Sequence, residues 1–247
     1  MDKLVNILGV RFSTVNSDII NKKLWRILSG NNNATVFTPN AEILYEASKD
    51  MNFSKVLNSA TLLIPDGIGI YLASVFLGSP FGNRFTGIGI AEQILSIAAG
   101  SGLRVFLLGA TEGVAEKAAA ELCLHYEGLC ICGTHHGYFD KSTDSEENTR
   151  VLRKIKDSEA DVVFVCFGSP VQEKWIFDNA KNLPRVRLFM GLGGSLDVWS
   201  KKLSRAPRLF QALGLEWLWR LICEPKRILR FPRLVFFALR VIKQALC

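Results

Sequence analysis

The chain has 247 residues, of which 49% are hydrophobic. That is enough to bury a substantial core, as one large domain or one domain with an appendage, and it excludes a disordered or fibrous protein. The net charge of +7 resides in residues 205–247, where nine Lys and Arg stand against two acidic residues, whereas the charges of residues 1–204 balance. We therefore expect a neutral body, residues 1–204, and a basic C-terminal segment, residues 205–247.

The N-terminus, MDKLVNILGV, lacks the basic region, long apolar segment and cleavage site of a signal peptide. No stretch of the sequence approaches the ~18 uninterrupted apolar residues of a membrane-spanning helix. The six cysteines form no CxxC pair, and Cys166 lies in the apolar run VVFVCFG, which favours a reduced thiol in the core. These features predict a protein of the reducing cytoplasm.

Short apolar runs that end in Gly, Asp or Asn recur along the body, and nearly all of them precede a helical pattern. In chain order they are LVNILGV (4–10), ATVFTPN (34–40), ATLLIPD (60–66), LRVFLLGA (103–110), DVVFVCFG (161–168) and VRLFMGLGG (186–194). This alternation of strand and helix predicts an α/β fold with parallel strands.

The clearest strand–helix unit begins at residue 103, where Gly109 ends the strand and residues 112–125 form an alanine-rich helix. Gly109 and Ala110 would let a nucleotide approach the backbone closely, and the free N–H groups of the helix start would favour a diphosphate. Many α/β proteins have such a turn, so this signal alone does not identify the ligand.

Polar residues lie at or near the ends of the predicted strands. They are Thr38 and Asn40 in FTPNAEI, Asp66 in IPDG, Arg84 in NRFTG, Gln172 and Glu173 in FGSPVQEKW, and Asp197 in GGSLDVW. One such residue alone would be a cap or turn residue. Because most of these motifs directly follow a strand, we expect their side chains to converge at one edge of the sheet.

Asp66 has two interpretations. Pro65 prevents the strand from continuing, and residues 67–73 have the composition of a helix start, so Asp66 could simply cap that helix. It also stands at the carboxyl end of a strand, where open α/β sheets bind their ligands. The local sequence leaves both interpretations open.

Two nucleotide-binding motifs and one metal motif are incomplete. GIGIAE (87–92) has only the first two glycines of a dinucleotide fingerprint, and GLGGSLD (191–197) lacks the lysine of a P-loop, which argues against an NAD-dependent oxidoreductase or an ATPase. The crowded run CICGTHHGYF (130–139) could hold zinc, but it has no second ligand pair. A strand end followed by an exposed histidine loop is the simpler interpretation.

The end of the basic segment has an amphipathic helical pattern that Pro232 would divide into two helices. Lys226, Arg230, Arg233 and Arg240 project within one arc, and Leu229, Val235, Phe236, Leu239 and Ile242 lie mainly elsewhere. This arrangement favours docking on an anionic membrane surface. An ordinary helix packed on the core, or a nucleic-acid-binding tail on a non-catalytic module, remains as an alternative.

The motifs TPNAE, PDG, RFTG, GSPVQEKW, GLGGSLDVW and RAPRLFQALGLEWLWRLICEPKR occur in this order. Together they closely resemble the bacterial WecG/TagA/CpsF glycosyltransferase family, from about Leu4 to about Arg230. The resemblance implies a Rossmann-like, mostly parallel sheet with helices on both faces and a helical C-terminal appendage. It also implies an inverting, metal-independent enzyme without a cofactor. The expected reaction is sugar transfer from a UDP donor to a polyprenyl-diphosphate-linked saccharide of teichoic acid, capsule or exopolysaccharide.

Within this resemblance, Asp66 matches the catalytic base, which would take the proton from the acceptor hydroxyl. Arg84 and Gln172 match polar groups that hold the sugar or diphosphate. Thr38 and Asn40 match donor or acceptor contacts, and Asp197 matches a binding position.

The sequence has no DxD motif for a metal, so fixed arginines would stabilise the departing UDP. Arg220, Arg227 and Arg230 match appendage arginines that would fold over the active site. The resemblance further implies a peripheral protein on the inner face of the cell membrane, with possible self-association and no nucleic-acid partner.

Overall fold

The computed structural model describes residues 4–13 and 16–246, with only the backbone of residues 226 and 227. Its centre is a six-stranded parallel sheet in the order β4-β3-β8-β7-β5-β6. In chain order these strands are Ala34–Phe37 (β3), Leu62–Leu63 (β4), Arg104–Gly109 (β5), Cys130–His135 (β6), Val162–Cys166 (β7) and Leu188–Gly191 (β8). The predicted α/β class with a mostly parallel sheet is confirmed.

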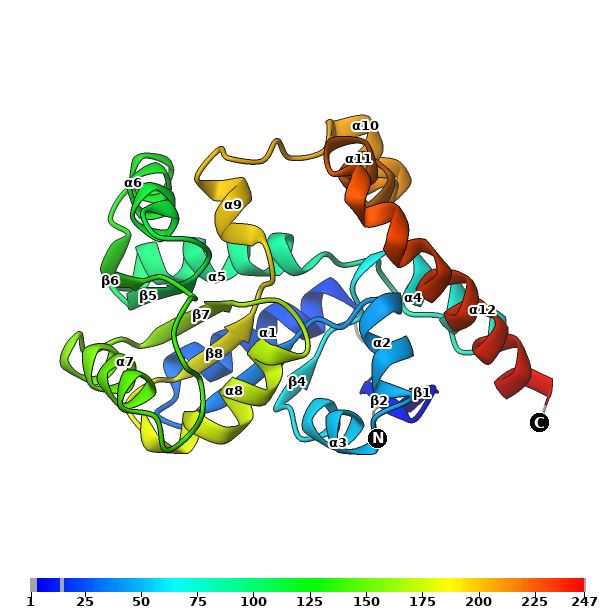
Figure 1. Cartoon of the computed structure of the whole chain (residues 1–247), viewed down its shortest axis with the longest axis horizontal. Coiled ribbons are helices and arrows are strands. Elements are labelled where there is room, and N and C mark those ends of the chain that lie inside the picture. The colour runs from blue at the N-terminus through cyan, green and yellow to red at the C-terminus, as the bar shows by residue number, and fades with distance from the viewer. Residues whose placement is uncertain (1–3, 14–15, 247) are drawn as a thin grey trace.

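Helices cover both faces of the sheet, and each face has its own hydrophobic core (Figure 1). One face packs against α1 (Ser17–Ser29), α5 (Gly87–Ser101), α6 (Val114–His125) and α9 (Ser195–Trp199). The other packs against α2 (Ala41–Ala47), α3 (Met51–Asn58), α4 (Gly67–Phe76), α7 (Glu146–Asp157) and α8 (Val171–Asn179), and a short 3₁₀ helix, η1 (Ala180–Asn182), follows α8. Strand residues alternate between the two cores, as Val163 and Phe164 do, because successive side chains point to opposite faces.

The first apolar run is not part of the parallel sheet, which corrects the sequence prediction. Leu4–Ile7 (β1) pairs antiparallel with Val10–Ser13 (β2) in a separate two-stranded sheet. The turn between them places Leu8 at φ 52° and Gly9 at φ 86°. Two successive left-handed residues match the twist of a tight hairpin, so the chain reverses directly instead of crossing over through a helix.

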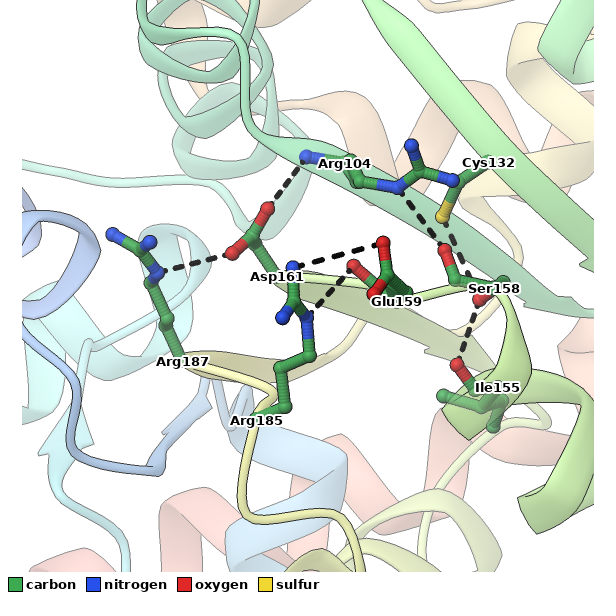
Figure 2. Close-up of polar contacts among 8 residues, drawn as sticks. All are labelled: Arg104, Cys132, Ile155, Ser158, Glu159, Asp161, Arg185 and Arg187. Atoms are coloured by element: carbon green, nitrogen blue, oxygen red, sulfur yellow. Dashed lines mark hydrogen bonds and ion pairs between the residues drawn. The ribbon is translucent and has the colours of Figure 1, made fainter.

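The amino ends of the central strands are joined by one aspartate, Asp161 (Figure 2). Its Oδ2 accepts a hydrogen bond from the backbone N–H of Arg104 at 3.0 Å, and its Oδ1 lies 3.0 Å from Nε of Arg187. Arg187 in turn donates through Nη1 to the carbonyl of Leu28 at 2.8 Å. This cluster ties β5, β7, β8 and α1 together at the edge of the sheet opposite the strands' carboxyl ends.

The C-terminal segment forms α10 (Arg208–Leu213), α11 (Glu216–Cys223), the 3₁₀ helix η2 (Pro225–Arg230) and α12 (Phe231–Leu246). Figure 1 shows α12 running beside α2 and α4. The predicted division of the end of this segment into two helices is confirmed: η2 ends at Arg230, α12 begins at Phe231, and Pro232 lies in the first turn of α12, where its missing N–H is not needed. An earlier break comes at Glu224, whose backbone leaves the helical region. Within the described part of the chain, no helix is long and apolar enough to cross a membrane.

The predicted basic arc of this segment faces the protein. Arg230 pairs with Glu42 at 4.0 Å, Arg233 with Glu46 at 3.5 Å, and Arg240 donates to the carbonyl and hydroxyl of Ser48 at 2.8 Å. The side chain of Lys226 lies outside the described residues. Three of the four arc residues therefore contact α2 or its C-cap, Ser48, and apolar residues form much of the exposed surface of α12.

Candidate active site

A cavity of about 1640 Å³ lies at the carboxyl ends of the parallel strands and extends beneath the C-terminal helices. Among the residues predicted from the sequence, its lining includes Thr38, Asn40, Asp66, Arg84, Ala110, Gln172, Asp197, Arg220 and Arg230. Gly109 is the last residue of β5, directly before Ala110. The side chain of Arg227 lies outside the described residues. Strand ends and C-terminal helices thus contribute to one common site.

Asp66 occupies the N-cap position of α4 but makes no side-chain cap bond there, so the helix-cap interpretation is wrong for this helix. Its Oδ1 instead accepts the backbone N–H of Gly87, the first residue of α5, at 3.2 Å. Among the described side chains, none forms an ion pair with Asp66. Its carboxylate is therefore held in place by a neighbouring helix and is not occupied in capping its own.

Burial raises the pKa of Asp66 to about 6, against the opposing effects of the nearby Arg220 charge and the Gly87 N–H. A carboxylate with this pKa is mostly ionised at neutral pH and is a stronger base than an ordinary aspartate. The site therefore provides a proton acceptor that works near pH 7.

Gly87 is a site residue that the sequence reasoning missed. A Cβ at this position would lie 2.7 Å from Oγ1 of Thr38 and 3.9 Å from Oδ2 of Asp66. The absent side chain lets α5 approach both polar residues closely. The local signal was Thr86, which caps α5 by accepting the N–H of Gly89 at 3.2 Å, so that the helix starts at the glycine.

Gln172 links the loops that follow β7 and β8. Its Oε1 accepts the N–H groups of Gly168 at 3.3 Å and Gly193 at 2.8 Å, and its Nε2 donates to Glu173 Oε1 at 2.8 Å. The Gln172 residue is only 4% exposed. Burial also raises the pKa of Glu173, whose Oε2 has no hydrogen-bond partner. The Gln172 amide thus fixes two glycine loops that border the cavity.

Arg84 connects the body to the C-terminal helices. Its Nη2 donates to the carbonyls of Gln211 and of Ala212, the latter at 3.1 Å, near the carboxyl end of α10. A guanidinium at this position satisfies carbonyls that a helix end leaves without intrahelical partners. Arg84 therefore lines the cavity and at the same time holds α10 against it.

Asn40 and Asp197 also have local partners. The side chain of Asn40 caps α2 by accepting the N–H of Ile43 at 3.1 Å. Asp197 pairs with Lys202 at 3.1 Å, and Lys202 reaches Thr111 at 3.3 Å. Both residues keep polar atoms at the cavity wall while they stabilise the adjoining loops.

The turn after β5 was expected to let a ligand approach the backbone at Gly109 and Ala110, but the structure gives Gly109 a different reason. Gly109 has φ 142°, and a Cβ there would lie 2.5 Å from the carbonyl oxygen of Cys166. The neighbouring strand β7 therefore requires this glycine. Ala110, at φ 58°, presents the turn to the cavity.

An aromatic wall beside this turn was also missed from the sequence. Tyr138 is largely exposed and lines the cavity, and Nζ of Lys141 lies 4.6 Å from the ring centres of both Phe139 and Phe167. The only sequence signal was GYFDK, an aromatic pair after Gly137. This wall offers a flat face and a positive charge together, a combination that suits a planar anionic ligand.

No group of three or more His, Cys, Asp or Glu side chains capable of holding a metal ion occurs among the described residues. The run considered for zinc, residues 130–139, forms strand β6 and the loop after it. At the end of β6 the ring Nδ1 of His135 contacts the carbonyl of His136 at 2.7 Å.

Comparison with a family model and comparison with known proteins point to the same kind of enzyme. Residues 5–247 match the family model described as "Glycosyl transferase WecG/TagA/CpsF family". The chain is 34% identical over 241 residues to proteins from Staphylococcus aureus strains NCTC 8325 / PS 47 and MRSA252, covering 97% of this chain and 92% of each relative. Both relatives are named N-acetylglucosaminyldiphosphoundecaprenol N-acetyl-beta-D-mannosaminyltransferase.

Proposed function

The chain belongs to the WecG/TagA/CpsF glycosyl transferase family, and on that premise we propose which sugar transfer it catalyses. The donor is a UDP-linked hexose, N-acetylmannosamine, its uronic acid or a related sugar. The acceptor is a saccharide linked through diphosphate to a polyprenol, and the product serves bacterial cell-surface polysaccharide synthesis. The names of the S. aureus relatives support both the hexosamine and the lipid-linked acceptor.

The proposed mechanism rests on one observation, the buried and under-partnered carboxylate of Asp66. Its carboxylate accepts the proton of the acceptor hydroxyl while that oxygen forms a bond to the anomeric carbon of the donor sugar. The bond from this carbon to the UDP oxygen breaks on the opposite face, so the configuration inverts and UDP departs. The raised pKa of Asp66 and the absence of a side-chain cap bond to α4 support this role.

Departing UDP gains negative charge, which an enzyme without a metal must stabilise through fixed positive groups. Arg220 and Arg230 come from the C-terminal helices and line the same cavity as Asp66, and Arg84 lines it from the body. Planar guanidinium groups bind phosphate oxygens in pairs. These arginines support metal-independent catalysis and a catalytic part for the C-terminal segment.

Attachment to the inner face of the membrane is the corresponding proposal for location. Leu229, Val235 and Leu239 of the C-terminal helices are large exposed apolar side chains. Since the nearby arginines contact α2, apolar insertion contributes more to this attachment than the sequence pattern indicates. The same ion pairs weaken the case for a nucleic-acid-binding tail.

Transfer from a panel of UDP-sugars to a short polyprenyl-diphosphate N-acetylglucosamine analogue, measured in EDTA, tests the proposal. We expect transfer from one donor with the wild type and with Asp18→Asn, a control at an exposed carboxylate in α1. Asp66→Asn should bind UDP but lose most turnover.

Three outcomes would contradict the proposal in different ways. Loss of transfer in EDTA would contradict metal independence. Wild-type turnover by Asp66→Asn would remove Asp66 as the base. No transfer from any UDP-sugar, together with no UDP binding, would overturn the donor assignment.

A further inference from the structure

Helix α4 combines an uncharged sequence with an exposed surface. Its ten residues, GIGIYLASVF, include no charged side chain. Leu72 and Phe76 are nevertheless each 57% exposed, and both line the cavity that contains Asp66. A surface helix normally carries charge on its exposed face, so an apolar wall at this place indicates a surface that is covered when the protein works.

Helix α12 forms the facing wall of the same cavity. Its lining positions recur every three or four residues and include Leu234, Ala238 and Val241. Phe237 and Val241 are each only 4% exposed, so they form a closed floor beneath the more exposed walls. The two helices thus enclose an apolar groove, which we call the α4–α12 groove.

Contacts at the two ends of α12 fix the direction of this groove. Asn40 caps α2 just after the carboxyl end of β3, and Glu42 and Glu46 of α2 pair with Arg230, the last residue of η2, and with Arg233 in the first turn of α12. At the far end of α12, Gln244 accepts the N–H of Leu8 at 2.8 Å in the β1–β2 hairpin. The groove therefore starts beside Asp66 and leads away from it along roughly 15 Å, the length of α4.

The lining changes chemically along this direction. At the start of the groove the lining holds Arg220, whose charge acts on Asp66, and the ion pairs of Arg230 with Glu42 and of Arg233 with Glu46. After Arg233, the cavity residues contributed by α12 are all uncharged, and α4 has no charge along its length. Arginines suit a diphosphate, and the remaining surface suits a hydrocarbon.

We propose that the α4–α12 groove binds the first isoprene units of the acceptor's polyprenyl chain. This inference rests on the proposed function. The acceptor in the relatives' name contains a sugar, a diphosphate and undecaprenol in that order. The base Asp66, the arginines and the apolar groove follow one another in the same order, so one extended molecule matches all three parts.

The groove differs from the surface proposed for membrane attachment. Leu229, Val235 and Leu239 are exposed, but they do not line the cavity. In this proposal the outward surface, with Leu229, Val235 and Leu239, contacts the bilayer. The α4–α12 groove binds a lipid chain that has moved out of the bilayer. This separation allows the two surfaces to be tested independently.

Calorimetric binding of two prenyl diphosphates to the full chain, without membranes or donor, tests the groove. Geranyl and geranylgeranyl diphosphate share the same charged group and differ only in tail length. We expect geranylgeranyl diphosphate to bind at least about tenfold more tightly, because its longer tail buries more apolar surface. In the double variant Leu72→Ser, Phe76→Ser, this ratio should fall by about tenfold or more.

Two further variants serve as controls. Leu124→Ser alters a leucine of α6 that is 84% exposed and does not line the cavity, and it should keep the wild-type ratio. Leu239→Ser should weaken binding to anionic vesicles and also keep the ratio. Circular dichroism should show the same fold in all variants, since each altered side chain is mostly exposed.

Equal affinity of the wild type for the two diphosphates would overturn the proposal, and so would an unchanged ratio in the double variant. A ratio lost equally in Leu239→Ser would place the tail on the outward surface and would also overturn it. These binding measurements need no sugar transfer, so failure of the groove and failure of the proposed reaction give different results.

Discussion

The central sheet has an aspartate near an arginine at each end of its strands, and the two aspartates differ in how fully their oxygens are paired. At the amino edge, both oxygens of Asp161 have close partners, the Nε of Arg187 and the backbone N–H of Arg104 (Figure 2). At the carboxyl edge, one described N–H, that of Gly87 at 3.2 Å, donates to Asp66, and the Arg220 charge acts on Asp66 without forming an ion pair with it. A satisfied carboxylate holds strands together, whereas an under-partnered one remains free for proton transfer.

Asp66→Asn should separate activity from stability most sharply. We expect turnover to fall about 10³-fold, as is usual when a catalytic base is removed. The free energy of unfolding near pH 7 should rise by roughly 1 to 3 kcal/mol, because the raised pKa shows that the folded protein disfavours this charge. Initial rates would measure turnover, and urea unfolding would measure the free energy of unfolding. A destabilised but fully active variant would show that Asp66 has a structural role and is not the base.

Asp161→Ala should do the opposite at the other edge. Removing one partner of a largely buried pair leaves the Arg187 charge and the Arg104 N–H without their acceptor, at a cost of about 3 kcal/mol. Urea unfolding measures this loss. Turnover per folded molecule should stay at the wild-type value, and a strong loss of turnover would show that the amino edge also shapes the site.

Gln172→Leu tests whether the site depends on its supporting bonds. The substitution preserves much of the side-chain volume but leaves the N–H groups of Gly168 and Gly193 without their acceptor, which should cost about 2 kcal/mol of stability. Turnover should fall about tenfold as the two loops loosen. Unchanged turnover with reduced stability would assign Gln172 a purely structural role.

The pH profile tests the carboxyl edge without any substitution. Because the base must be ionised, kcat/KM should fall about tenfold per pH unit below the Asp66 pKa of about 6 and level off above it. The free energy of unfolding should change in the opposite direction and rise as the pH falls. Protonation removes the buried charge, so Asp66 destabilises the folded protein least below the pKa that it has in the unfolded chain. A rate plateau extending down to pH 4 would contradict the raised pKa.

The sequence was sufficient to predict the parallel sheet and the polar residues at the strand ends, because apolar runs and the polar residues after them are local signals. It was not sufficient for the hairpin, since Leu8 gives no local indication that it adopts a left-handed conformation. The helical pattern of residues 226–242 located an amphipathic helix but not which face packs. That choice depends on Glu42 and Glu46, which are far away in the sequence.

The two hydrogen bonds of Gln244 have a consequence for synthesis of the chain. Its side chain joins Asn6 and Leu8, residues 238 and 236 positions earlier. The hairpin is translated before α12, so these two hydrogen bonds can form only after α12 has been made. The nascent body can begin to fold before α12 emerges, but Arg230 and Arg233 reach their partners on α2 only after the segment that carries them has been made. Among the described residues that line the cavity, the C-terminal helices are therefore the wall that is translated last.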